Sequence, residues 1–101
     1  GTQTKSVIQE RMEEVTEDLI IVNPQGLHAR PAANLVKTAL QFKSDIRISV
    51  NGQTANAKSI MGLLTLAAAQ GAVLTVTCRG EDAPAAMAAL RQLVESGFGE
   101  V

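Results

Sequence analysis

Aromatic residues are nearly absent from this sequence of 101 residues, which has no Trp, no Tyr and only two Phe, Phe42 and Phe98. A chain of this length forms one domain with one packed core. Because 46% of the residues are hydrophobic, Ala, Val, Leu and Ile must build that core. The scarcity of large rings therefore predicts a core of small and branched side chains.

Cysteine is also scarce, since Cys78 is the only one. A lone Cys excludes an intrachain disulfide and a cysteine zinc site, and its apolar surroundings predict a small core residue. No stretch approaches the length of a membrane span, and no signal peptide is visible. We therefore expect a reduced, cytoplasmic setting without membrane insertion.

Neither sign of charge is in large excess, because the formal net charge is −1 at pH 7. Residues 1–18 carry two basic and five acidic side chains, whereas the rest of the chain carries seven basic and five acidic ones. This distribution lacks the basic stripe that nucleic-acid binding requires. No nucleic-acid partner is expected.

Hydrophobic periodicity predicts the element order β-α-β-β-α-β-α. Strands are expected at 17–22, 45–50, 53–56 and 72–78, and helices at 29–42, at 59–68 and between Asp82 and Gly97. Asn51 and Gly52 are a strong hairpin signal, and Asp82 and Gly97 are expected to cap and end the last helix. The residues expected to face the core from the first helix and the second strand are Ala32, Ala33, Val36, Ala39, Leu40, Ile46, Ile48 and Val50.

A four-stranded sheet with helices on one face buries these apolar stripes, which predicts the α+β class. Residues 1–16 are polar, and Val7, Ile8, Met12 and Val15 form only a thin stripe. Such a stripe folds as a helix only when something packs on it, and a linker is an equal alternative. We therefore divide the chain into an N-terminal extension or linker at 1–16 and a domain at 17–101.

The sole histidine, His28, lies in "QGLHARPAANLVK" (25–37), where the first helix is expected to begin. Gly26 allows a sharp turn before it, and Pro31 suits a first helical turn. The N–H groups of Ala29 and Arg30 then have no intrahelical acceptor, and together with the Arg30 guanidinium they form an anion site beside the imidazole.

The positive field at this helix end disfavours imidazolium and leaves one ring nitrogen free to attack phosphorus. Phosphoryl transfer on and off His28 is one interpretation of the stretch. The other is that His28 is simply a capping or surface residue. The residues alone leave both open.

Two long motifs resemble those of a known family. "NPQGLHARPAANLV" and "SDIRISVNGQTANAKSIMGLLTLAAAQGAVLTVTCRGED" are similar to segments of HPr, the histidine-containing phosphocarrier family of the bacterial phosphoenolpyruvate:sugar phosphotransferase system. The resemblance covers about residues 18–98. It implies an open-faced β-sandwich, in which three helices cover one side of four antiparallel strands.

The resemblance also implies a role for each matched residue. His28 matches the histidine that is phosphorylated at Nδ1 by phospho-enzyme I and then passes the phosphoryl group to an enzyme IIA domain. Arg30 matches the arginine that contacts the phosphoryl group, and the Ala29 amide helps to bind it. Such transfer needs no metal and no cofactor. The resemblance implies a phosphocarrier, which relays the group stoichiometrically, rather than a free-standing enzyme, although a parent fusion protein would be a phosphotransferase.

Ser59 is expected to be the N-cap of the second helix. In the family, "KSIMG" matches the site of HPr kinase/phosphorylase, so the resemblance implies regulatory phosphorylation at Ser59. A phosphate there would add about two negative charges to the docking face. It could block enzyme I and recruit a transcription regulator.

A docking patch for partners is implied beside His28. Leu63 and Leu66 are expected in the core, whereas the patch would stay outside it. Gly62 and Leu64 stand where enteric relatives have Lys and Gln, which makes the patch less polar. The matched docking positions are Leu27, Lys37, Ile60, Met61 and Leu64.

Three alternatives to a stand-alone phosphocarrier stay open. One is a regulatory binding module of the same fold, although such modules lack the active histidine. Another is the HPr domain of a larger multiphosphoryl-transfer fusion, which the acidic lead-in and the "SGFGE" ending would suit. The last, a small histidine enzyme, lacks a partner base in the sequence. A monomer is expected, and the sugar served is not visible.

Overall fold

The computed structural model describes residues 13–100, which form a four-stranded sheet, three α-helices and a C-terminal 3₁₀ turn. All strand pairs are antiparallel, in the order β1-β4-β2-β3. The predicted element order and the α+β open-faced sandwich are confirmed. The elements are β1 (Glu14–Ile20), α2 (Ala29–Ala39), β2 (Asp45–Val50), β3 (Gln53–Asn56), α3 (Ile60–Thr65), β4 (Val73–Arg79), α4 (Ala83–Glu95) and η1 (Gly97–Gly99).

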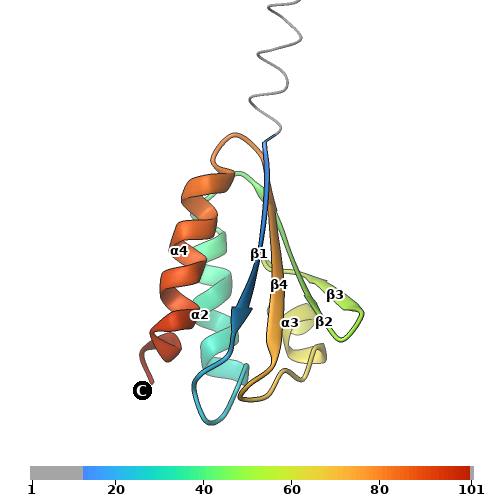
Figure 1. Ribbon diagram of the computed structural model, residues 1–101, viewed down its shortest axis with the longest axis vertical. Coiled ribbons are helices and arrows are strands. Elements are labelled where there is room, and N and C mark those ends of the chain that lie inside the picture. Colours follow the sequence, from blue (N-terminus) through green and yellow to red (C-terminus); the bar gives the residue numbers. More distant parts are fainter. Residues whose placement is uncertain (1–12, 101) are drawn as a thin grey trace, which may run out of the picture.

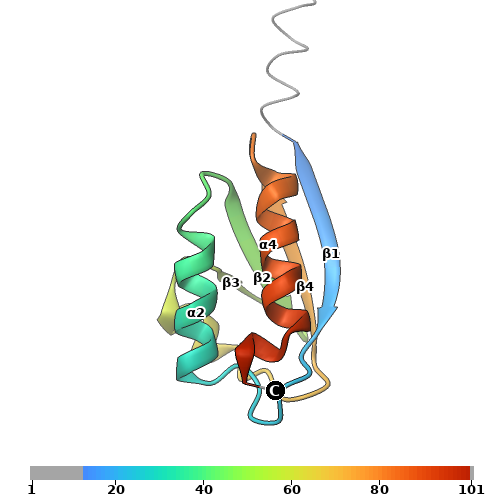
Figure 2. The same cartoon turned by 90° about the vertical axis from the view of Figure 1, so that its left-hand side faces the viewer.

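Helices α2 and α4 lie side by side on one face of the sheet (Figures 1 and 2). Strand β2 alternates as predicted, since Ile46, Ile48 and Val50 are buried while Asp45 and Arg47 are exposed. Small residues on the inner face of α4 let this helix pack closely on β1 and β4, while α2 packs against α4 and α3. The buried helix residues are Pro31, Ala32, Leu35, Val36 and Ala39 on α2 and Ala83, Ala86, Met87, Leu90 and Val94 on α4.

No helix within residues 13–100 combines the length and the apolar character that a bilayer crossing needs. The lone Cys78 is fully buried, as predicted. Burial raises the pKa of its thiol to about 11, so this group stays protonated and unreactive at neutral pH.

Strand β1 begins at Glu14, three residues before the predicted start. Glu14 pairs with Arg79 and Val15 with Cys78, and the hydroxyl groups of Thr16 and Thr77 hydrogen bond across the two strands. One half-buried apolar residue in a polar run was too weak a signal for a strand. Residues 1–12, and with them most of the predicted extension, lie outside the described residues.

Both shorter helices end earlier than predicted, α2 at Ala39 and α3 at Thr65. Ala33 and Leu40 were expected to face the core but are exposed, and Leu35 is fully buried in their place. Alanine is compatible with either face of a helix, so the alanine-rich stripe left the buried face of α2 poorly defined.

Asp82 occupies the N-cap position of α4 but makes no side-chain cap hydrogen bond. Its carboxylate instead accepts hydrogen bonds from the backbone N–H groups of Lys43, at 2.8 Å, and Ser44, at 3.0 Å, and from the Ser44 hydroxyl. Gly80 makes this approach possible, because a Cβ there would lie 2.9 Å from the Ser44 Cα. Asp82 therefore links the start of α4 to the segment that enters β2.

These contacts predict the effect of Asp82→Ala. The hydrogen bonds from the Ser44 hydroxyl and the Lys43 backbone hold the pKa of Asp82 below its usual value. We expect the substitution to lower the free energy of unfolding at neutral pH by about 1–3 kcal/mol, because it leaves buried donors unpaired. Urea titrations measure this loss.

The same experiment at lower pH tests the origin of the loss. A carboxyl group with a depressed folded-state pKa stabilises the fold above its unfolded value, and this contribution disappears as the pH falls through the folded value. The gap between wild type and Asp82→Ala should therefore shrink in acid. Glu81→Ala, at the exposed neighbouring position, should show no such loss; an equal loss there would contradict the assignment.

Candidate functional site

His28 is the N-cap of α2, in extended backbone conformation with φ −82° and ψ −171°. Its carbonyl accepts the hydrogen bond of Ala32 N–H at 3.0 Å, so the helix begins at Ala29. The N–H groups of Ala29 and Arg30 therefore lack intrahelical acceptors, as predicted. The His28 side chain is 34% exposed, which leaves it reachable from solvent.

The loop before His28 is clamped to the loop that follows α3. Leu27 N–H donates to the Ala68 carbonyl at 2.8 Å. Gly26 has φ +69°, and a Cβ there would collide with the Ala68 carbonyl and lie 2.9 Å from the Ala69 Cα. Only glycine fits this left-handed, crowded position, and its fit fixes where α2 and His28 begin.

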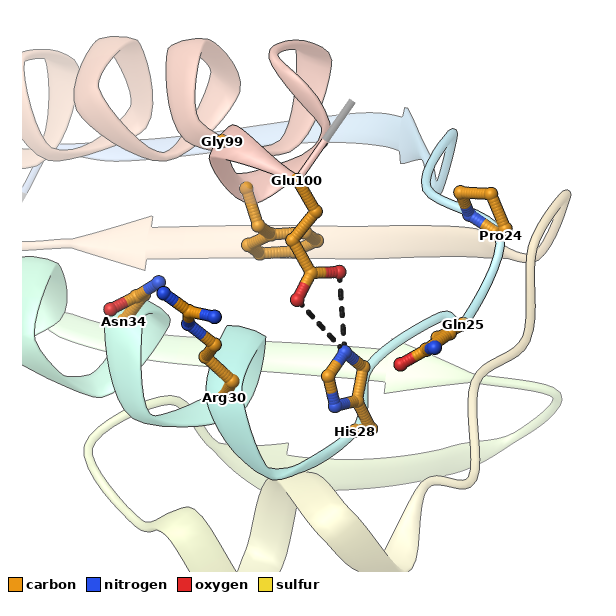
Figure 3. Close-up of a pocket in the computed structure, with 8 residues that line it drawn as sticks. Pro24, Gln25, His28, Arg30, Asn34, Gly99 and Glu100 are labelled. Carbon is orange, nitrogen blue, oxygen red and sulfur yellow. Dashed lines mark hydrogen bonds and ion pairs between the residues drawn. The ribbon is translucent and has the colours of Figure 1, made fainter.

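A carboxylate that the sequence analysis did not assign contacts His28. The imidazole Nε2 lies 2.9 Å from Glu100 Oε2 and 3.2 Å from Oε1 (Figure 3). This carboxylate therefore engages Nε2 and leaves Nδ1 outside the contact. The two residues are 72 positions apart, so no local motif could have paired them.

The C-terminal turn η1 places Glu100 over His28. Helix α4 ends at Glu95, and Gly97, Phe98 and Gly99 then adopt φ values of 67°, 56° and 75°. Phe98 is 4% exposed, and burial of its ring offsets the strain of a left-handed backbone. One of the two aromatic residues therefore anchors the turn that carries Glu100. Both views of the fold show the turn after α4 at the same end of the molecule as the start of α2 (Figures 1 and 2).

Asn23, which is fully buried, joins this turn to the histidine loop. Its Nδ2 donates to the Gly26 carbonyl at 2.8 Å and to Glu100 Oε1 at 2.9 Å. Both partners are acceptors, so the amide nitrogen must face them. Within the described residues, Asn23 Oδ1 is left buried without a hydrogen-bond partner. Such a group costs about 1–3 kcal/mol, which the two donated hydrogen bonds offset.

Electrostatics keep Glu100 ionised. Burial alone would raise the pKa of Glu100, but the hydrogen bonds from His28 and Asn23 and the positive charge of Arg30 outweigh that effect. The pKa of Glu100 therefore lies below its usual value. The carboxylate accepts hydrogen bonds and cannot donate one at neutral pH.

Arg30 is exposed and lies on the first turn of α2, in the pocket that also holds His28 and Glu100. Figure 3 shows its guanidinium extending toward Asn34 rather than toward the His28 ring. The predicted convergence of Arg30 on the imidazole is thus a shared pocket rather than a direct contact. No cluster of three or more His, Cys, Asp or Glu within residues 13–100 could hold a metal ion. The open pocket is lined by Pro24, Gln25, His28, Arg30, Asn34, Phe98, Gly99 and Glu100.

The predicted docking positions divide into exposed and buried ones. Ile60 and Met61 on α3 are 41% and 74% exposed, Lys37 on α2 is exposed, and Leu64 is half-buried. Leu27 is 4% exposed and packs in the core, so its side chain cannot extend a docking surface, and that prediction is wrong. The backbone clamp on Ala68 turns this side chain inward.

Ser59 and its neighbours follow the sequence prediction. The Ser59 Oγ accepts a hydrogen bond from Gly62 N–H at 3.1 Å, which confirms the N-cap. Leu63 and Leu66 are buried, as expected. The α3 helix packs against α2, so its exposed apolar side chains lie on the helix-covered side of the molecule.

Comparison with known proteins identifies the family. The family model described as "PTS HPr component phosphorylation site" matches residues 15–96. The phosphocarrier protein HPr of Xylella fastidiosa (strain 9a5c) is 49% identical over 83 residues, which are 82% of this chain and 93% of that protein. HPr of Neisseria meningitidis serogroup A is 44% identical over 84 residues, covering 83% of this chain and 94% of the relative.

Solved structures agree with the sequence relatives. The crystal structure of HPr-C-His from Thermoanaerobacter tengcongensis superposes with a TM-score of 0.81 and 47% identity, covering 89% of this chain and 99% of that one. HPr from Bacillus anthracis str. Ames gives a TM-score of 0.77 and 43% identity, covering 80% and 96%. The chain therefore belongs to the HPr family, the phosphocarrier proteins of the bacterial phosphoenolpyruvate:sugar phosphotransferase system.

Proposed function

We propose that His28 carries the phosphoryl group on Nδ1, receiving it from phospho-enzyme I and passing it to an enzyme IIA domain. One observation supports this assignment above the others. Nε2 is engaged by Glu100 at 2.9 Å, so Nδ1 is the free nitrogen of a solvent-accessible imidazole at a helix start. A histidine that only capped the helix would need neither that exposure nor the hydrogen bond that fixes the preceding loop to the Ala68 carbonyl.

The transfer is a displacement at phosphorus between two histidines. The Nδ1 lone pair forms the new N–P bond, and the bond between phosphorus and the nitrogen of enzyme I breaks, returning its electron pair to that nitrogen. The proton on Nε2 stays in place. The second transfer, to enzyme IIA, reverses these roles, so the chain ends unchanged and acts as a stoichiometric carrier.

The first turn of α2 supplies the anion site. The N–H groups of Ala29 and Arg30 and the positive end of the helix dipole favour a phosphoryl group beside His28. Arg30 contributes a flexible guanidinium in the same pocket, which turns from Asn34 toward the phosphoryl oxygens as these arrive. Positioning and charge stabilisation are the main needs of this reaction.

Partners would dock on the exposed apolar surface of α3. Ile60 and Met61 form its centre, with Leu64 partly exposed beside them and Lys37 on its rim. Exposed apolar side chains of this kind suit a carrier that meets more than one protein in turn. Monomeric action in the cytoplasm, as a separate protein or within a larger phosphotransferase fusion, is part of the same proposal.

A second role at Ser59 is favoured by its position. The Ser59 Oγ lies half-buried at the start of α3, directly before exposed Ile60 and Met61. Phosphorylation there by HPr kinase/phosphorylase would put negative charge on the docking surface. This charge would hinder enzyme I and offer a transcription regulator a new feature to bind.

His28→Ala tests the central assignment. Incubation with phosphoenolpyruvate and enzyme I should give an acid-labile phosphoryl group on the wild-type chain and none on the variant, because the nucleophile is missing. Ser59→Ala serves as the control and should accept label as the wild type does. Acid-labile label on His28→Ala would refute the proposal.

Arg30→Ala should slow phosphoryl transfer without unfolding the domain. Loss of one charged donor, worth about 1.5–3 kcal/mol, corresponds to a rate loss on the order of 10- to 100-fold. Rapid-quench measurement of the transfer rate checks this. Arg47→Ala, which removes an exposed arginine on β2, is the matched control; equal rates for wild type and Arg30→Ala would exclude the phosphate role.

HPr kinase with ATP tests the second role. It should place acid-stable label on the wild-type chain and on His28→Ala, and none on Ser59→Ala. Phosphorylation should also reduce acceptance of phosphoryl groups from enzyme I. Continued acid-stable labelling of Ser59→Ala would move the modification to another residue.

A further inference from the structure

The contacts of Asn23 and Glu100 exceed what a C-terminal turn needs for stability. Phe98 already anchors the turn in the core, yet the turn also delivers a carboxylate to one nitrogen of the only histidine. We infer that Asn23 and Glu100 form a hydrogen-bonded relay that keeps the His28 proton on Nε2 and balances the charge gained when Nδ1 binds phosphorus. This inference rests on the proposed function of His28.

The direction of the relay follows from which atoms can donate. A carboxylate accepts only, so the imidazole nitrogen at 2.9 Å from Glu100 Oε2 must carry the proton. A neutral imidazole has one N–H, and the tautomer protonated at Nε2 has its lone pair at Nδ1. Glu100 therefore selects the nucleophilic form of the ring.

Asn23 holds Glu100 from the opposite side. Its amide nitrogen donates to Glu100 Oε1 and to the Gly26 carbonyl, and the buried Oδ1 is left without a partner in the described part of the chain. The amide nitrogen thus donates two hydrogen bonds, while the amide oxygen accepts none. The hydrogen bond to Glu100 orients the carboxylate, and the hydrogen bond to Gly26 orients the loop that carries the imidazole. Together they fix the position of the carboxylate relative to the imidazole.

Charge gives the carboxylate a second task. An imidazole that keeps its proton on Nε2 while Nδ1 binds phosphorus becomes a cation, and the electron pair of the broken bond leaves with the donor nitrogen. The ionised Glu100 faces the side of the ring where this proton remains, so it stabilises the cation as it forms. Buried carboxylates orient and stabilise catalytic imidazoles of serine proteases in the same way. Glu100 and Asn23 are therefore positioning residues.

The tautomer is directly measurable, because the chain has one histidine and therefore two imidazole nitrogens. In ¹⁵N-labelled protein at alkaline pH, where imidazole is neutral, the wild type should show predominantly the Nε2–H tautomer. Glu100→Ala should shift the population toward a mixture, by removing the acceptor. This readout needs neither enzyme I nor activity.

Transfer kinetics provide the second readout. Glu100→Gln and Glu100→Ala should lower the maximal rate of phosphoryl acceptance about tenfold while leaving the apparent KM for phospho-enzyme I unchanged, since the docking surface is intact. Glu100→Asp should restore part of the rate. Glu95→Gln, at an exposed carboxylate ending α4, carries the same charge change and should match the wild type.

Asn23→Ala should slow acceptance in the same direction. In the double variant with Glu100→Ala its effect should be smaller than in the wild type, because the contribution through Glu100 is already lost and only the hydrogen bond to the Gly26 carbonyl remains. Additive losses would remove Asn23 from the relay. Where Asn23→Ala fails to fold, the Glu100 variants decide the proposal alone.

The outcomes separate this inference from the function on which it rests. Acid-labile phosphoryl label on His28→Ala would refute the assignment of the carrier function to His28. Label confined to His28, together with an unchanged tautomer population and an unchanged rate in Glu100→Ala, would overturn the relay and leave the carrier function standing. A fall in affinity for phospho-enzyme I at constant maximal rate would make Glu100 a docking residue and also overturn the relay.

Discussion

The functional end of the molecule depends on the buried amide of Asn23. This side chain hydrogen bonds to both the loop before His28 and the C-terminal turn, through Gly26 and Glu100. Because both partners are acceptors, the amide nitrogen must face them, which fixes the orientation of the amide. In this orientation the amide oxygen has no hydrogen-bond partner among the described residues. Two segments from opposite ends of the chain thereby reach a fixed relative position.

The same end shows how a core with almost no aromatic residues still builds a firm site. Alanine and branched residues let α4 lie close to β1 and β4 and let α2 pack against α4, which leaves little room for a large ring inside. Phe98 is placed after the end of α4, between two glycines, where its ring closes the core beside the site. The strained backbone at this residue is thus tied to the position of Glu100, two residues on.

The local sequence pattern correctly predicted those features that depend on residues close together in the chain. The element order, the inward residues of β2, the Ser59 cap and the position of His28 at the start of α2 all follow from spacings within a few residues. Three of the failures depend on distant partners. Asp82 was expected to cap its own helix, but Ser44 and Lys43 offer its carboxylate better donors. Leu27 was expected at the surface, but the Ala68 clamp turns it inward. Glu100 carried no local signal at all, and only a glycine-flanked phenylalanine before it hinted at a folded turn.

His28 lies between the start of helix α2 and the carboxylate of Glu100, two groups of opposite charge. The helix start on one side presents N–H groups and the positive dipole end, which attract an anionic phosphoryl group. The C-terminal turn on the other side presents a carboxylate, which attracts the proton and the positive charge of the ring. In the proposed transfer, an imidazole placed between them would be polarised from Nε2 toward Nδ1, the direction in which electron density moves during attack on phosphorus. Neither segment could do this alone, because a helix start without the carboxylate leaves the tautomer unspecified, and a carboxylate without the helix start gives the phosphoryl group nothing to bind.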